Sequence, residues 1–564
     1  MMKALGITLL ASLMTLTAWA QEYTFNNGIF FINEDRYGPN QGSINYYSYD
    51  YNEMMYNVYA MANPTTKLGV TTQQGQLYGG RLFVVSKQAN GSESSGNTSG
   101  SRLAILDAAT LNQQGSLLRF GASADSVYDG RSYCAVSPGK GYVATSAGIF
   151  VFDVNAMTAT GPIQGTQSSA KGDYNSLYND QCGDMVRFGQ YVFAVQQGLG
   201  LHVIDPATDQ VVATLPFPDI VTVFVTAGGN LYVANNSREA YDFGGGPYEA
   251  DFTCIDPVTF QVKKVHQLDD MHGAFSTWGA WRARMLCVDP VDEIVYYYYD
   301  EYQNYISCYD FTTCEFTDHF IDLPEAAEIN WDGTRNHQGL YASAMSFDPH
   351  SGDLVVQTLE AAPMYAYQIF NHNWVLFYDA RSHQLKRQVR LQDDYWFPAM
   401  ALYPDLCAPS LHLDDQVLPV GGEVSISMLN AVVDRDNMSA LAVSTACSAN
   451  EGVVRATMRG LDLVLQGIAP GRTTVTVTTD SNGRLATSSF GVTVSAVSVP
   501  GDVNMDGVVA IDDVSDIIDI LLGSVLTVYD PVAADVDRDG AITISDVAIL
   551  IDMLLKGKGL MIND

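Results

Sequence analysis

The chain has 564 residues, 47% of them hydrophobic, and a formal net charge of −34 from 63 acidic and 29 basic residues. Its length favours several domains over one core, and its composition is that of a globular protein. The acidic excess argues against nucleic-acid backbones and anionic membrane surfaces as partners, because both bind basic patches, and it suits divalent cations wherever carboxylates gather.

The start of the chain has the pattern of a secretory signal. Lys3 supplies a basic end, residues 4–18 are mostly small and apolar, and Ala18-Trp19-Ala20 gives a small-x-small cleavage pattern. The apolar run is short for a membrane span, and no second such stretch follows. We expect a protein exported through a cleavable signal peptide, with no transmembrane segment, located outside the cell, at the cell surface or in the periplasm.

Residues 22–404 are rich in expected strands and contain a repeated unit, in which an apolar residue, Asp and two or three turn-forming residues separate two strands. Such an Asp accepts hydrogen bonds from backbone N–H groups two residues on, and Pro after it pre-sets φ for a type I turn. The Asp residues of the repeat are Asp50, Asp107, Asp153, Asp205, Asp256, Asp310 and Asp379. Periods of about 50 residues filled with short strands indicate four-stranded propeller blades.

Residues 397–402 look like the first strand of another unit, but no unit follows them. We expect this segment to complete the first blade, whose other strands begin near residue 28, so that the ring closes and no sheet edge is left open. This arrangement predicts seven blades.

Residues 28–34 and 38–44 resemble the opening of an uncharacterised family of exported, YncE-like propellers from Gram-negative gut-type bacteria. The resemblance covers roughly residues 25–404 and implies an exported β-propeller. Some relatives capture cobalamin at the cell surface and are typically lipid-anchored, whereas this chain has no Cys at the expected cleavage site.

The long connections of the propeller are expected on the face opposite the Asp turns, and long loops on a rigid scaffold are where binding sites usually lie. Aromatic side chains in or beside these loops can stack on a sugar or a planar ring system, or pack between the blades instead. The candidate ligand-binding residues are His272, Trp278, Trp331, Tyr365 and Trp396.

No catalytic motif is evident: the sequence has no Gly-x-Ser-x-Gly elbow, no zinc-binding His-Glu-x-x-His and no phosphate-cradling glycine loop. Glycosidase propellers place two carboxylates across the central channel, and several acidic residues are expected near it. These are Asp173, Asp180, Asp184, Glu328 and Asp332. We assign no catalytic residue, and a glycoside hydrolase or lyase for polysaccharide breakdown stays an alternative.

The eight Cys are scattered, unlike the pattern of a small disulfide scaffold. Cys308 and Cys314 flank a predicted turn and are the one candidate pair for a disulfide bridge. The bridge would form only if the strand register brings their Cβ atoms close to bonding distance.

Alternating runs at residues 424–428 and 474–478 indicate antiparallel strands with one buried face. Residues 465–478 and 490–494 resemble bacterial immunoglobulin-like domains of group 2, which most often act as spacers.

Two segments, residues 502–513 and 535–546, have the pattern of a calcium loop. Calcium takes many oxygen ligands, here from loop positions 1, 3, 5, 7 and 12, and Gly at position 6 permits the sharp turn. The predicted ligands are Asp502, Asn504, Asp506, Val508 and Asp513 in the first loop, and Asp535, Asp537, Asp539, Ala541 and Asp546 in the second, with Val508 and Ala541 acting through their carbonyls. We expect two calcium ions.

Each loop runs into a segment with one apolar helical face. The matching positions, at a constant offset of 33, are Val514, Ile517, Ile518, Leu521 and Leu522 in the first and Val547, Leu550, Ile551, Leu554 and Leu555 in the second. We expect these two faces to bury each other as a pseudo-symmetric pair.

The segment before the first loop is a poor helix, and Asp stands at position 12 of both loops, so the module resembles a dockerin type I domain over residues 501–558. Dockerins typically dock onto cohesin domains. The resemblance implies Ile511, Asp512, Ile544 and Ser545 as partner-contact positions.

The sequence thus predicts a mainly β protein in four parts: a signal peptide (1–20), a seven-bladed β-propeller (21–407), an immunoglobulin-like β-sandwich (408–499) and a small α-helical dockerin-like calcium module (500–564). We interpret it as an exported, non-catalytic binding protein. Its propeller would recognise a glycan or a planar small molecule, and its dockerin would dock onto a cohesin-like partner. A structural role as a surface-layer component is a further alternative.

Overall fold

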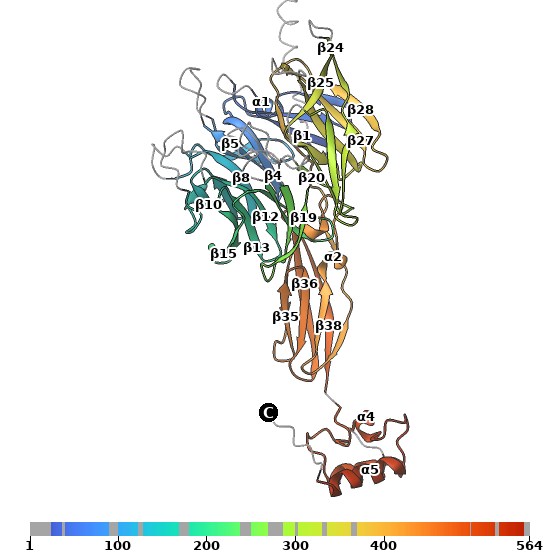
Figure 1. The fold of residues 1–564 in the computed structure, drawn as a ribbon. Coiled ribbons are helices and arrows are strands. Elements are labelled where there is room, and N and C mark those ends of the chain that lie inside the picture. Colours follow the sequence, from blue (N-terminus) through green and yellow to red (C-terminus); the bar gives the residue numbers. More distant parts are fainter. Residues whose placement is uncertain are drawn as a thin grey trace, which may run out of the picture.

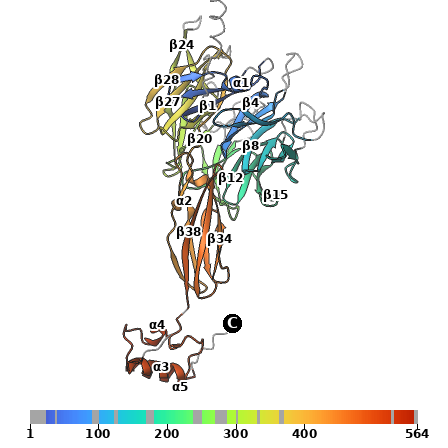
Figure 2. The same cartoon turned by 180° about the vertical axis from the view of Figure 1, so that it is seen from behind.

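The computed structural model describes residues 24–35, 40–89, 100–121, 128–168, 180–236, 250–268, 286–298, 303–329, 335–361, 369–496, 498–524 and 529–557. In Figures 1 and 2 these residues form a large assembly of β-sheets, a slender pair of sheets below it and a small helical unit near the C-terminus. No helix among the described residues is long and apolar enough to cross a membrane.

Five four-stranded antiparallel sheets of the large assembly have their strands in simple chain order. Their strands are β4 (Val70–Tyr78), β5 (Arg81–Gln88), β6 (Leu103–Asp107) and β7 (Gln113–Leu117); β8 (Gly130–Ser137), β9 (Lys140–Thr145), β10 (Gly148–Asp153) and β11 (Thr158–Thr160); β12 (Cys182–Phe188), β13 (Tyr191–Gln196), β14 (Gly200–Asp205) and β15 (Gln210–Pro216); β16 (Ile220–Val225), β17 (Leu231–Asn236), β18 (Ala250–Ile255) and β19 (Val262–Gln267); and β20 (Leu286–Val288), β21 (Ile294–Tyr297), β22 (Tyr305–Asp310) and β23 (Glu315–Asp322).

A larger sheet joins the two ends of this assembly. Its strands are β1 (Gly28–Asn33), β2 (Ser43–Ser48), β3 (Glu53–Met55), β24 (Glu325–Ile329), β25 (Arg335–Phe347), β26 (Asp353–Ala361), β27 (Ile369–Asp379), β28 (Leu385–Arg390) and β29 (Pro398–Leu402), and a short helix, α1 (Val58–Ala62), follows β3. β29 runs antiparallel to β1, with Phe31 opposite Ala401, and meets β25 in parallel. The predicted pairing of residues 397–402 with the first strands is therefore confirmed.

The sheets surround a common axis. Their first strands contact one another in succession from β29 through β4, β8 and β12 to β16, and from β20 through β25 back to β29. Aromatic side chains fill the wedges between neighbouring sheets. Phe83 of β5, for example, stacks on Tyr133 of β8 with ring centroids 4.3 Å apart. The apolar core therefore lies between the sheets.

The Asp turns predicted from the repeat are present between the third and fourth strands of these sheets. The Asp107 carboxylate accepts hydrogen bonds from the backbone N–H groups of Ala109 (3.1 Å) and Thr110 (2.9 Å). Acceptance from a backbone N–H two residues on recurs at Asp153, Asp205, Asp256, Asp310 and Asp379. The Asp50 carboxylate differs, because it accepts from the Asn27 side chain.

The cysteines are free thiols. Cys308 lies in β22 opposite Thr317 of β23, whereas Cys314 lies in the turn between these strands, with φ of 60°. The register thus brings Thr317 opposite Cys308, and the candidate bridge between Cys308 and Cys314 does not form.

Residues 410–495 form two packed sheets. Their elements are β30 (Ser410–Leu411), β31 (Gln416–Pro419), β32 (Glu423–Ser427), α2 (Met428–Ala431), β33 (Val432–Val433), the 3₁₀ helix η3 (Ser439–Leu441), β34 (Val443–Ser448), β35 (Val454–Arg459), β36 (Asp462–Gly467), β37 (Gly471–Ser481) and β38 (Arg484–Ser495). β31, β38, β37 and β34 form one sheet, and β32, β36 and β35 form the other. Val475, Phe490 and Leu465 belong to their shared core, as the alternating pattern predicts.

The two-sheet unit is joined to the large assembly through several contacts. The Gly79 N–H donates to the carbonyl of Asn482 (2.7 Å), and the Tyr78 hydroxyl donates to the Asp480 carboxylate (2.5 Å). Ala440 packs in the same buried cluster as strand residues of β12–β18. Hydrogen bonds and apolar packing therefore both fix this junction.

The C-terminal unit contains α3 (Ile511–Leu521), α4 (Pro531–Ala534) and α5 (Ile544–Leu555). α3 and α5 contact each other and lie beneath α4 in the view of Figure 2. The two candidate calcium loops lie directly before α3 and α5.

Candidate metal centre

The first loop is organised around the carboxylate of Asp502. Its two oxygens accept hydrogen bonds from the backbone N–H groups of Asp506 (3.1 Å) and Gly507 (3.0 Å). The side-chain oxygen of Asn504 accepts from the Asp506 N–H (2.9 Å), and the Asp506 carboxylate accepts from the Val508 N–H (2.9 Å). The loop is therefore curled around its own oxygen-bearing side chains.

The last residue of the loop, Asp513, is fully buried and connects both ends of the loop. One of its oxygens accepts from the Val503 N–H (2.7 Å) and the Asn504 N–H (3.2 Å), and the other accepts from the Ala510 N–H (2.8 Å). The last of these bonds also caps the start of α3. One carboxylate thus ties the loop to the helix that follows it.

The second loop repeats this pattern 33 residues later. Asp535 accepts from the N–H groups of Asp539 (3.1 Å) and Gly540 (2.9 Å). Asp546 is fully buried and accepts from the N–H groups of Asp537 (3.2 Å) and Thr543 (2.8 Å). The Thr543 hydroxyl, at the position of Ala510 in the first loop, accepts from the Ser545 N–H (3.1 Å) and so caps α5.

The backbone takes the same path in both loops. Met505 and Arg538 have φ of 61° and 62°, and Gly507 and Gly540 have φ of 87° and 92°. Open space surrounds both glycines, so a side chain would meet no clash there. It is the left-handed backbone conformation that favours glycine at position 6.

The donor set fits a hard cation. Carboxylate oxygens of Asp535, Asp537 and Asp539 lie within 4.8 Å of one another. Burial raises the pKa of Asp502, and the nearby carboxylates of Asp513 and Asp506 add to this rise. Calcium prefers oxygen ligands and would compensate such a group of like charges. The structure therefore brings together three of the predicted side-chain ligands of the second loop, Asp535, Asp537 and Asp539.

The two helices bury less of their apolar faces than the sequence predicted. The shared core contains Val514 and Ile517 of α3 with Val547 and Leu550 of α5. Residues before, within and between the loops belong to this core or pack against it, and these are Val499, Val503, Val509, Tyr529, Ala534, Val536 and Ile542. Leu554 of α5 also packs against this core, whereas Leu522 and Leu555 are exposed, so the two predicted faces bury each other in part.

The apolar residues outside this core form a paired surface. Ile511 and Leu522 of the first half are 70% and 77% exposed, and their counterparts Ile544 and Leu555 are 71% and 82% exposed. Ile518 and Ile551 are also exposed. We call these six residues the paired apolar patch. The predicted partner-contact residues Asp512 and Ser545 are exposed beside it.

Most of the predicted ligand-binding residues of the large assembly, His272, Trp278, Trp331 and Tyr365, lie outside the described residues. Trp396 is buried, with its ring stacked on Tyr56 at a centroid distance of 5.2 Å. Its ring N–H donates to the carbonyl of Gln392 (2.8 Å). Trp396 therefore packs within the assembly and does not present an open ring face.

The acidic residues expected near a central channel do not form a described catalytic pair. Asp184 accepts a hydrogen bond from the Thr222 hydroxyl (2.5 Å). Asp173, Asp332 and the Glu328 side chain lie outside the described residues.

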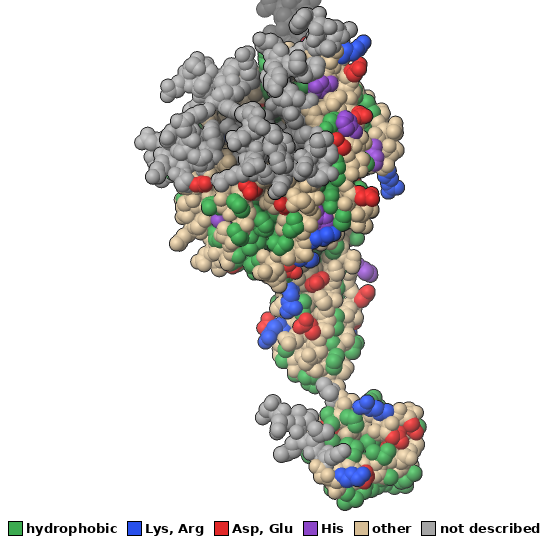
Figure 3. Space-filling view, in the orientation of Figure 1, with side chains coloured by type: hydrophobic (Ala, Val, Ile, Leu, Met, Phe, Trp, Pro, Cys, Tyr) green, Lys and Arg blue, Asp and Glu red, His purple; other side chains and the backbone are tan. Residues whose placement is uncertain are grey.

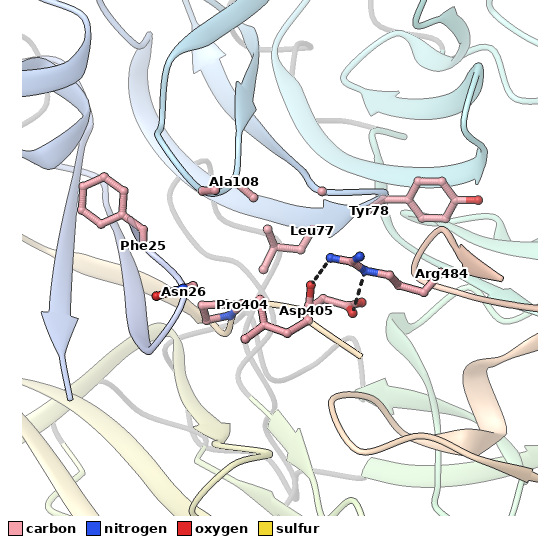
Figure 4. A pocket seen from close by; sticks show the side chains of 11 residues that line it. Phe25, Asn26, Leu77, Tyr78, Ala108, Pro404, Asp405 and Arg484 are labelled. Carbon is pink, nitrogen blue, oxygen red and sulfur yellow. Dashed lines mark hydrogen bonds and ion pairs between the residues drawn. The ribbon is translucent and has the colours of Figure 1, made fainter. Parts of the chain in front are cut away.

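A small pocket lies at the junction between the large assembly and the two-sheet unit (Figure 4). Leu77, Phe25 and Pro404 line it, and an ion pair between Arg484 and Asp405 (3.5 Å) forms part of its wall. Its volume of about 80 Å³ is well below the several hundred Å³ of typical ligand pockets. No sequence pattern indicated this pocket, because its lining residues come from distant parts of the chain.

Comparisons with known proteins agree with this architecture. Residues 27–404 match the family model described as "Domain of unknown function (DUF5074)", and residues 500–555 match the model of the dockerin type I domain. No curated protein matches the chain. The dockerin match supports calcium as the ion of the loops and a cohesin as the partner.

Three solved structures are similar to this chain at low sequence identity. A quinonprotein alcohol dehydrogenase-like protein from Bacteroides thetaiotaomicron is 13% identical, with a TM-score of 0.46, over 68% of this chain and 79% of that one. The β-propeller domain of Cps50 (Swd1) from Myceliophteria thermophila is 12% identical, with a TM-score of 0.35, over 59% and 95%. The WD40 domain of Pan2 from Neurospora crassa is 12% identical, with a TM-score of 0.33, over 55% and 75%.

Proposed function

The chain belongs to the DUF5074 family, and from this premise we propose that it is an exported binding protein, in which a β-propeller recognises an extracellular ligand and the dockerin type I domain docks the protein onto a cohesin-like partner. A signal peptide over residues 1–20 would direct the export. The proposal assigns the protein no catalytic residue.

The observation that supports docking is the paired apolar patch. Leu522 and Leu555 are 77% and 82% exposed although they belong to amphipathic helices, and hydrophobic side chains are visible on the surface of this module in Figure 3. Exposed apolar residues gathered on one small module are typical of an interaction surface. A protein partner that covers them would remove them from water.

Two calcium ions, one in each loop, would order this surface. Each loop ends in the first turn of the helix that bears one half of the patch. The buried carboxylates of Asp513 and Asp546 tie loop to helix. Cation binding by the other loop carboxylates therefore stabilises the position of the helix starts. The carbonyls of Val508 and Ala541 would complete the ligand sets.

For the propeller, we propose seven blades. Five are the separate four-stranded sheets, and the larger sheet divides at its single parallel contact into β25–β28 and into β29 with β1–β3, which makes seven. The two-sheet unit would be an immunoglobulin-like spacer that holds the propeller away from the docking module.

We place the ligand site of the propeller on the face opposite the Asp turns, with His272, Trp278, Trp331 and Tyr365 as candidate contacts. The support is topological, because these residues lie in connections that leave the sheets on that side, with Trp331 in the short connection between β24 and β25. Stacking on aromatic rings would suit a glycan or a planar small molecule. The buried Trp396 is assigned to packing.

The docking proposal is tested by titrating the full chain into purified cohesin domains by calorimetry, with calcium and with chelator. We expect binding only with calcium, and loss of binding when Leu522→Lys and Leu555→Lys are combined, while calcium affinity is unchanged. Val532→Lys is the matched control, because Val532 is an equally exposed apolar residue (66%) on α4, outside the patch. Docking that survives the double substitution would show that the patch is not the interface.

A further inference from the structure

The larger sheet has two parts, β29 with β1–β3 (the first sheet) and β25–β28 (the last sheet). These two parts meet face to face, with β1 and β27 lying near each other in Figures 1 and 2. Part of this contact is apolar. Phe31 of β1, Tyr47 of β2, Val355 of β26 and Phe377 of β27 belong to one buried cluster, and the rings of Tyr47 and Phe377 lie 5.5 Å apart.

Further along the same strands the facing residues become polar. Asn33 follows Phe31 by two positions on β1, and Asn45 precedes Tyr47 by two on β2. Gln357 follows Val355 by two positions on β26. Because strand side chains alternate between faces, these three side chains point into the space between the two sheets. Polar side chains thus extend the apolar contact.

Several polar atoms in this space have no hydrogen-bond partner. They are Oδ1 of Asn33, Oδ2 of Asp35, Nδ2 of Asn45 and both amide atoms of Gln357. Asn33 and Asn45 are fully buried, Gln357 is 1% exposed and Asp35 is 7% exposed. An unsatisfied buried polar atom costs about 1–3 kcal/mol, and a buried carboxylate costs more. Such a concentration of them indicates that something is bound there.

Other contacts link two of these residues, Asn33 and Asp35. The Asn33 side chain donates to the hydroxyl of Ser43 (3.0 Å), and Ser43 is also hydrogen-bonded to the Asp35 carboxylate. The ionisable groups that act on Asp35 are Asp394 and Glu34, which are both acidic. The charges that act directly on Asp35 are therefore negative, while Lys87 and Arg131 act on Glu34.

We propose that this cluster is a calcium-type cation site, in which the Asp35 carboxylate and the amide oxygens of Asn33 and Gln357 are ligands. Three oxygen atoms that lack donors are the ligand type that hard cations prefer. With water alone, the Asp35 carboxyl, whose pKa burial raises well above its ordinary value, would be protonated, whereas a cation would hold it in its charged form. A cation would bind the three oxygens, while the amide N–H groups of Asn45 and Gln357 would still need a water acceptor, and the cation would staple β29 with β1–β3 to β25–β28 where the ring closes.

The proposed staple is independent of docking, because it lies in the propeller and involves no residue of the dockerin. The Trp residues make it measurable apart from the dockerin loops. The chain after residue 407 contains no Trp, whereas Trp396 lies beside the site, since its carbonyl accepts from the Asp35 N–H (3.4 Å). Terbium in the propeller would therefore be sensitised by Trp excitation, and terbium in the dockerin loops would not.

The experiment titrates terbium into the full chain that carries Asp502→Ala and Asp535→Ala, and follows terbium emission excited through Trp. We expect saturable emission that calcium displaces, and an affinity at least tenfold weaker in Asp35→Asn. Asp393→Asn is the matched control, because it removes an exposed carboxylate close to Asp394 in sequence and should leave the affinity unchanged.

Gln357→Glu gives a test of opposite sign, which also serves if Asp35→Asn fails to fold. It adds a carboxylate oxygen at the site, so a cation should bind severalfold more tightly and its effect on the unfolding temperature of the propeller should grow. Absence of Trp-sensitised emission, or an affinity that neither substitution changes, would overturn the proposal and leave bound water as the explanation of the orphan atoms.

Discussion

The buried carboxylate of Asp513 provides the sharpest test of the metal centre. Asp513→Ala removes an acceptor that serves three backbone N–H groups, those of Val503, Asn504 and Ala510, and also removes a predicted calcium ligand. We expect the C-terminal module to lose both stability and calcium affinity, while the propeller is unaffected.

The size of the effect follows from these bonds. A hydrogen bond to a charged group contributes about 1.5–3 kcal/mol, and three of them would give about 5–9 kcal/mol if they were additive. After the substitution, some of the freed backbone N–H groups can form hydrogen bonds with water instead. We therefore expect the free energy of unfolding to fall by about 3–5 kcal/mol. A module of roughly 60 residues has a total stability of about 3–9 kcal/mol. The loss is therefore comparable to the whole stability of the module.

Scanning calorimetry of the full chain measures this change. The transition that responds to chelator should disappear, or need far more calcium to return, in Asp513→Ala, and Asp546→Ala should behave alike because its position is equivalent. Asp513→Asn keeps the shape and should give a smaller loss. Asp519→Ala, an exposed residue of α3 outside the loop, is the control. An unchanged transition and calcium stoichiometry in Asp513→Ala would refute this account of the loop.

Three further predictions concern the rest of the chain. Burial raises the pKa of Asp405 from 3.8 to about 6, so the stability that its protonated form provides is complete below pH 3.8 and is lost as the pH rises through about 6. After solvent screening we expect this loss of folding free energy to be about 1–2 kcal/mol. The unfolding midpoint should therefore depend on pH in the wild type and not in Asp405→Asn, and a flat wild-type profile would contradict this. Ala399→Asp places a carboxylate at a fully buried position of β29 and should destabilise the propeller by at least about 3 kcal/mol in chemical denaturation, whereas a wild-type midpoint would show that ring closure tolerates a charge there. In the native protein a thiol reagent should modify the exposed Cys314 quickly and the buried Cys308 only after unfolding, and equal rates would contradict this burial.

Local patterns predicted the structure well where the chemistry is local. The Asp turns and the calcium loops are defined by side chains that bond to backbone groups two to five residues away, as at Asp107 and Asp502. Such bonds are encoded in consecutive residues. The pairing of β29 with β1 was predictable for another reason, because an unpartnered strand at one end of the repeat matched an incomplete unit at the other.

Contacts between distant segments were not predictable in the same way. Tyr78 and Asp480 are 402 positions apart, and nothing in either neighbourhood indicates their hydrogen bond. Periodicity correctly gave α3 and α5 an apolar face, but it does not show which residues of that face are covered. The covering residues include Ala534 of α4, a four-residue helix too short for any periodic signal. The ring of Trp396 likewise gives no sign from sequence that Tyr56 stacks on it.

The two loops have equal geometry and unequal charge, and this difference predicts an order of calcium binding. The predicted side-chain ligands of the first loop include the neutral Asn504, whereas Asp537 stands at the equivalent position of the second loop, so the predicted ligands of the second loop carry one more negative charge. Ligand charge is one of the factors that set calcium affinity, so the second loop should bind first and more tightly. Calorimetric titration should resolve two steps, and Asp537→Asn should make the loops nearly alike, while Asn504→Asp should raise the affinity of the weaker step. If Asp537→Asn leaves both steps unchanged, charge at position 3 does not determine the order of binding. The hydroxyl of Thr543, which stands at the loop position of Ala510, is then a further difference between the loops to test.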